Sequence, residues 1–230
     1  MGRMSDPFPN STHAPTSTSL GLFMAEVTDL AREAMAWVGG ARWRPLSFDG
    51  TTMHHLYDAL PLTNRGGIGR EIYVPVGNGW VCYFNNSVGG TDTSSVLGYM
   101  ARQLGCRTIR CVVAEKPSSR WPAVIFEVFN GSFDWERSIA AMNDGGRWRF
   151  DLDGTPYPFE ELERYEAKRK ADRFKPDMLQ RYLRGLGVPP LIESNFQFDS
   201  AVLLENTRMP EKDRTRISYD PPEPWDTGPH

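Results

Sequence analysis

The chain has 230 residues, of which 40% are hydrophobic and 24% are charged, proportions that are typical of a soluble globular protein. The formal net charge is -3, and basic residues are interleaved with acidic ones, so the composition does not favour a nucleic-acid partner. No apolar run approaches the roughly 20 residues of a membrane span, and the N-terminus lacks the apolar core of a signal peptide, so we expect no membrane association.

Three cysteines, Cys82, Cys106 and Cys111, lie in or beside apolar runs, and their odd number favours reduced thiols over a disulfide framework. We therefore expect a cytoplasmic protein. His54 and His55 would point about 100° apart on a helix and would not chelate an ion by themselves, so we expect no metal and no cofactor. The sequence leaves open whether either histidine lies near Cys82.

The two ends differ in composition from the rest of the chain. Residues 1–18 and 206–230 are rich in Pro, Ser, Thr and charged residues and poor in aliphatic ones, which predicts disordered tails. The sequence therefore predicts one domain over residues 19–205.

The first half of that domain alternates helical and extended patterns. Residues 19–40 follow helical spacing and end at two glycines, which predicts a packing helix. Residues 51–60 predict a short helix before Pro61. The runs 70–76 and 79–86 flank an Asn-Gly pair and predict a hairpin, and a helix is expected to end near residue 104.

The second half predicts two more hairpins and two more helices. The hairpins are expected at 106–130 and at 137–153, the second turning across Asp-Gly-Gly, and the helices at 158–174 and 175–187. This order predicts an α+β fold with an antiparallel or mixed sheet, built largely from hairpins, and with the helices packed on one face.

Residues 150–155 read Phe-Asp-Leu-Asp-Gly-Thr and resemble the signature of the haloacid dehalogenase-like phosphohydrolases. The resemblance implies a nucleophile at Asp151, an acid and base at Asp153, bound Mg²⁺ and a parallel sheet covered on both faces. However, arginines alternate with aromatic residues over 147–150, which indicates a strand with one wet face. A turn leaving such a strand explains the same residues.

The segment Gly89–Ser95 lies between a predicted strand and a predicted helix. Backbone N–H groups at a helix start can hold an anion, which makes this turn a candidate site in a small hydrolase or an anion- or nucleotide-binding enzyme. The candidate residues are Gly89, Gly90, Thr91 and Thr93. The segment lacks the lysine of a P-loop, and helix capping explains the same residue types.

Acidic residues crowd a short region after the last predicted strand. A basic partner could bind this acidic patch, which comprises Asp151, Asp153, Glu160, Glu161 and Glu163. In its general make-up the chain resembles small α+β bacterial immunity proteins encoded beside secreted toxins. We therefore expect a non-catalytic protein-binding domain, of the type that inhibits a toxic enzyme, whose thermal stability survives charge reversal at Glu160 and Glu161. The sequence leaves the oligomeric state open.

Overall fold

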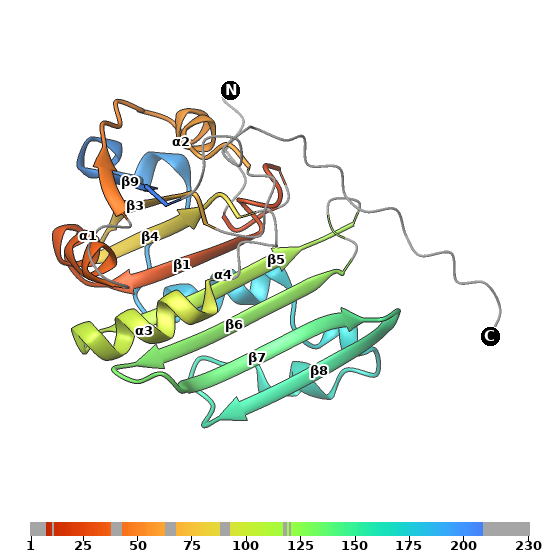
Figure 1. Cartoon of the computed structure of the whole chain (residues 1–230). Coiled ribbons are helices and arrows are strands. Elements are labelled where there is room, and N and C mark those ends of the chain that lie inside the picture. The colour runs from red at the N-terminus through yellow and green to blue at the C-terminus, as the bar shows by residue number, and fades with distance from the viewer. Residues whose placement is uncertain are drawn as a thin grey trace.

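The computed structural model describes residues 8–10, 12–37, 43–62, 68–87, 93–116, 119 and 121–208. Within these ranges, nine strands form one sheet in the order β2-β9-β3-β4-β1-β5-β6-β7-β8 (Figure 1). Every neighbouring pair of strands is antiparallel. The strands are β1 (Ser19–Met24), β2 (Trp43–Leu46), β3 (Arg70–Gly77), β4 (Trp80–Asn85), β5 (Arg107–Ala114), β6 (Ala123–Asn130), β7 (Trp135–Asp144), β8 (Arg147–Gly154) and β9 (Val202–Asn206).

Helices lie on both faces of this sheet. The helices are α1 (Val27–Ala36), α2 (Met53–Ala59), α3 (Ser94–Leu104) and α4 (Pro176–Gly185). Helices α1 and α3 pack with Phe23 and Tyr83 on one face, here called the front face, while α2 and α4 pack on the opposite rear face (Figure 1). The α+β class and the antiparallel sheet are confirmed, but the prediction that the helices pack on one face is not.

The predicted hairpins are present, because their turns carry residues that accept positive φ angles. Asn78 and Gly79 join β3 to β4 with φ of 53° and 75°, and Gly145 and Gly146 join β7 to β8 with φ of 60° and 87°. Primed turns of this kind match the twist of antiparallel strands. Local sequence therefore determined these connections.

The first predicted helix is wrong over its first six residues, because residues 19–24 form the central strand β1. Strand β1 lies between β4 and β5, with Leu20 and Leu22 in the rear core and Phe23 in the front core. A strand buried on both faces loses the alternation of apolar and polar residues, so its short apolar run cannot be told from a helix by periodicity.

The helix predicted over 158–174 is also wrong. This segment contains only two short 3-10 turns, η1 (Leu162–Glu166) and η2 (Lys170–Asp172), followed by the correctly predicted α4. Glu160 and Tyr165 turn inward to make buried hydrogen bonds with other parts of the chain. These long-range bonds outweigh the helical preference of the local sequence.

Two strands lie where no strand was predicted. Strands β2 and β9 pair with each other at one edge of the sheet, and β9 also pairs with β3. The buried Glu205 carboxylate of β9 accepts hydrogen bonds from Arg44 at 2.7 Å and from Arg70 at 3.1 Å. Part of the segment predicted as a tail is also packed, because Phe8 is 5% exposed and its N–H donates to the Leu191 carbonyl.

Gly154 at the end of β8 is expected to tolerate no side chain. Its φ is +80°, and a Cβ would lie 2.0 Å from the Glu136 carbonyl oxygen. Gly146 is a matched control, since its φ is +87° and a Cβ there would meet nothing within 4 Å. We expect Gly146→Ala to lower the free energy of unfolding by about 1–2 kcal/mol and Gly154→Ala to lower it clearly more, measured by urea unfolding. Equal losses would contradict the close backbone approach.

Candidate functional site

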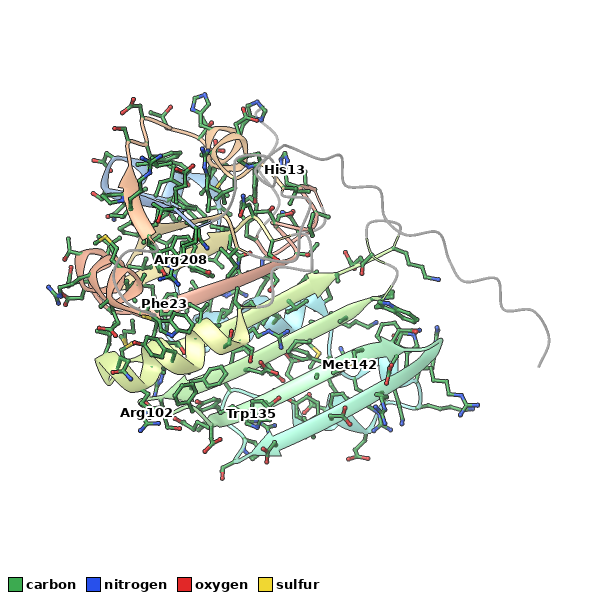
Figure 2. All side chains as sticks on the ribbon, in the orientation of Figure 1. His13, Phe23, Arg102, Trp135, Met142 and Arg208 are labelled. Atoms are coloured by element: carbon green, nitrogen blue, oxygen red, sulfur yellow. The ribbon has the colours of Figure 1, made fainter. Side chains whose placement is uncertain are left out.

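An exposed group of aromatic and acidic residues lies at the start of β7. We define the β6–β7 surface as Phe133, Asp134, Trp135 and Glu136, all of which are exposed. Phe133 is 48% exposed and Trp135 is 43% exposed. Figure 2 places Trp135 at the same end of the sheet as Arg102 of α3.

The two aromatic rings of this surface are held in place. The Trp135 indole donates from Nε1 to Asp153 Oδ2 at 2.6 Å, and its ring meets the edge of Phe129. Phe133 lies against Gly98 of α3, where a Cβ would come within 3.2 Å of the phenyl ring, and the Arg102 guanidinium stands 5.5 Å from the ring centre. Both rings are thus half exposed and yet positioned by contacts within the protein.

Local hydrogen bonds hold the segment between β6 and β7 in place. The Ser132 hydroxyl accepts from the Asp134 N–H at 3.0 Å and donates to the Asp134 carbonyl at 2.9 Å. The bond from Trp135 and the N–H of Gly154 hold the pKa of Asp153 below its usual range. Asp153 therefore brings negative charge beside the Trp135 ring, and Asp134 stands between the two aromatic residues in the sequence. The Glu136 carboxylate instead accepts a hydrogen bond from the Tyr157 hydroxyl at 2.8 Å.

The five predicted acidic residues do not share one surface. Strand alternation places Asp151 and Asp153 on the front face, because Phe150 next to Asp151 packs against the rear core. Glu160 lies with Tyr165 in the rear layer and is buried. Glu161 is engaged by Arg181 at 2.6 Å, and Glu163 is exposed.

Glu160 forms a buried ion pair that the sequence analysis missed. Arg137 donates from Nε to Glu160 Oε1 at 2.9 Å and from Nη2 to Oε2 at 2.6 Å, and both side chains are at most 2% exposed. Arg137 Nη1 also donates to the carbonyls of Asp153 and Gly154, each at 2.9 Å. The Tyr165 hydroxyl donates to Glu160 at 2.8 Å. This carboxylate is fully used inside the protein and cannot meet a partner.

Two of the remaining sequence hypotheses concern phosphate chemistry. Gly89, Gly90 and Thr91 lie outside the described residues, and Thr93 is buried at the N-cap of α3 without a side-chain cap bond. Asp151 and Asp153 lie on β8 at the edge of an antiparallel sheet. The parallel sheet implied by the phosphohydrolase resemblance is therefore not the fold of this chain.

Cys82 and His54 differ in burial. Cys82 is fully buried in the rear core, and burial raises the pKa of its thiol. The His54 side chain is 73% exposed, and its Nε2 lies 3.3 Å from Asp58 Oδ2. No group of three or more potential metal ligands occurs among the residues that the structure describes. None of the described helices is long and apolar enough to cross a membrane.

An open groove of about 650 Å³ lies beside the β2 edge of the sheet. It is lined by Leu46, Ser47, Phe48, Asp49, Gly50, His55, Asp58, Ala59, Arg70 and Leu203. Arg70 is its main cation, but the guanidinium donates to Glu205 and to the Ala59 carbonyl. Arg70 thus serves the sheet edge, and Asp58 of the groove pairs with His54.

Another buried carboxylate, that of Glu71, lies in the front core. Its oxygens accept hydrogen bonds from the hydroxyls of Tyr73 at 3.0 Å and Tyr83 at 3.1 Å, and Asn85 donates to Tyr83 at 3.3 Å. Burial raises the pKa of Glu71 to about 7, against the effect of the two tyrosine bonds. A strongly shifted pKa is typical of functional groups but also of structural ones. Glu71 is 3% exposed, which favours the structural interpretation.

The signals for the residues missed by sequence reasoning were present but weak. Glu71 follows Arg70 directly before the apolar run of β3, and Phe133 to Glu136 read Phe-Asp-Trp-Glu, which combines residue types common in binding surfaces. Nothing in the sequence marked Arg137 as buried. The chain matches no known protein family, no curated protein and no solved structure.

The buried ion pair reverses the expectation for charge changes at Glu160. Glu160→Gln leaves Arg137 buried without its anion, and breaking such a pair costs about 3–5 kcal/mol. Glu163→Gln changes an exposed side chain, and we expect it to alter the free energy of unfolding by less than about 0.5 kcal/mol. Chemical unfolding of the two variants checks this, and equal effects would show that the pair contributes little.

Glu71 makes stability depend on pH. Its folded pKa of about 7 lies above the unfolded value of 4.5, so the protonated acid stabilises the fold below pH 4.5 and that contribution is lost as the pH rises to about 7. Between about pH 4 and about pH 8, the free energy of unfolding of Glu71→Gln should rise relative to wild type by up to about 3 kcal/mol. Unfolding titrations of both proteins across this range measure it, and a constant difference would mean that Glu71 does not titrate abnormally.

Proposed function

We propose that this chain is a non-catalytic protein-binding domain whose β6–β7 surface binds a basic partner protein. The observation that carries the proposal is the pair of aromatic rings, Phe133 and Trp135, which are half exposed but positioned by internal contacts. Aromatic residues dominate the binding energy of many protein interfaces. Rings that are ordered before binding lose little conformational entropy when the complex forms.

The charge around the rings supports a basic partner. The exposed Asp134 and Asp153 carry negative charge, while Arg102 lies over the Phe133 ring. A surface with aromatic groups and an excess of carboxylates attracts a positively charged surface and speeds its association. Asp153 belongs to the acidic patch expected from the sequence, so the proposed site keeps part of that patch and moves its centre toward the start of β7.

Three ionisable groups that are buried inside the protein do not face a ligand. Glu160 is committed to Arg137, Cys82 is buried with a raised pKa, and Glu71 is enclosed by two tyrosines. An ordered aromatic and acidic surface suits an immunity-type inhibitor, which needs only to bind and block a toxic enzyme. We propose this class of partner as the specific form of the function.

The proposal is tested with the full chain carrying an affinity tag and expressed in its own host. The variants are Phe133→Ala and Trp135→Ala, with Trp121→Ala as a matched control, because Trp121 is 44% exposed and lies in the β5–β6 connection at the opposite end of β6. We expect a protein partner to co-purify with wild type and with Trp121→Ala. Loss of either ring of the site should weaken binding by about 30-fold or more, as expected when about 2 kcal/mol is lost.

Each result bears on one part of the proposal. A toxic enzyme whose activity falls on mixing with this chain would support the inhibitor role. A partner that binds all three variants equally would place the interface elsewhere. A clean protein without any stoichiometric partner would contradict the proposed function.

A further inference from the structure

Strand β8 is a long edge of the sheet without the length limit, proline or bulge that often prevents strand pairing. It is the last strand of the sheet and pairs only with β7 among the described strands, in a register without a bulge over Arg147–Gly154. The other edge, β2, has only four residues and includes Pro45, which has no N–H to donate. Edges are normally blunted by short length, proline, bulges, charged side chains or a covering segment. Strand β8 has eight residues and neither a proline nor a bulge, but it carries four charged side chains.

The sequence of β8 is complementary to itself. On the front face it places Arg147 and Arg149 before Asp151 and Asp153. When two such strands lie antiparallel with Phe150 opposite Phe150, each arginine faces an aspartate of the other copy. The pairs are Arg147 with Asp153 and Arg149 with Asp151, and the two-fold axis generates each pair twice.

Only this register pairs all the charges. A shift by two residues places Arg149 opposite Arg149 or Asp151 opposite Asp151, and an in-register parallel arrangement places every charge opposite its own kind. Like charges directly opposite each other destabilise a strand pair. The order Arg, Arg, Asp, Asp thus favours one strand register by attraction between opposite charges, and it disfavours the registers shifted by two residues by repulsion between like charges.

The rear side of the same strand gains apolar contacts in this register. Trp148 and Phe150 are half-buried against the rear core, while Leu152 is 46% exposed. Self-pairing sets Trp148 of one copy opposite Leu152 of the other, where directly opposed side chains come into contact. The exposed Leu152 side chain would then be covered by Trp148 of the other copy.

We propose that two copies of this chain form a dimer by antiparallel pairing of their β8 strands, which joins the two sheets edge to edge. The proposal goes beyond the proposed function and does not rest on it. Backbone hydrogen bonds and the apolar row supply the attraction, whereas exposed ion pairs are individually weak and mainly set the register. The existing bond from Trp135 to Asp153 and the exposed pair of Arg149 with Asp144 are compatible with it, because carboxylates accept several hydrogen bonds.

The test is the mass of the full chain by sedimentation at loadings from about 1 to about 300 µM, a range that covers small interfaces. Wild type should show a concentration-dependent dimer. Arg149→Asp and Asp151→Arg each set like charges against each other twice per dimer, so each alone should dimerise clearly more weakly than wild type. In an equimolar mixture of these two variants, positions 149 and 151 of one copy face opposite charges on the other, so the dimer should be restored. The double variant carrying both changes should dimerise for the same reason.

The controls separate pairing from folding. Asp144→Ala removes the partner of Arg149 within the chain and should leave the dimer intact. Circular dichroism and thermal unfolding should be nearly unchanged in every variant, because Asp151 is exposed and Arg149 has an exposed side chain. A monomeric wild type at the highest loading would overturn the proposal. So would single variants that dimerise as wild type does, or a mixture that dimerises no better than the single variants.

Discussion

The outer half of the molecule depends on the buried ion pair between Arg137 and Glu160. Arg137 ties β7 to the end of β8 through two backbone carbonyls, and Glu160 ties both strands to the C-terminal segment through Tyr165. A buried pair is stable only when its remaining hydrogen-bonding positions are filled. Here the guanidinium and the carboxylate both find further partners. The pair thereby holds the segment that covers the rear face against the last two strands.

This arrangement leaves the front face of β7 and β8 uncovered. Helices α1 and α3 cover the front of the inner strands, and among the described elements none lies in front of β7 and β8 (Figure 1). The residues that carry both proposals lie in this region: an ordered aromatic and acidic surface at the start of β7, and a self-complementary edge along β8. Glu160 is therefore used inside the protein by its ion pair with Arg137, whereas Asp151 and Asp153 remain exposed on the front face.

Short-range patterns predicted the parts of the fold that depend on local chemistry. The turn residues at Asn78 and at Gly145 predicted their hairpins, and Pro176 predicted the start of α4. Both predictions succeeded because residue type restricts the backbone φ angle. Strand β1 was mistaken for a helix since its burial on both faces erased the alternation. Strands β2 and β9 were missed because each is short and they pair with each other across about 160 positions of sequence.

The sequence by itself determined the α+β class, the hairpins and the region rich in acidic residues, since turn chemistry and composition act over a few residues. Only the tertiary structure decided which carboxylates stay available. Glu160 is turned inward to Arg137, and Glu71 is enclosed by Tyr73 and Tyr83, whereas Asp153 supports an exposed ring. These three carboxyl groups have the same chemistry but different roles, because their burial and their partners differ. Contacts between distant segments set both the burial and the partners.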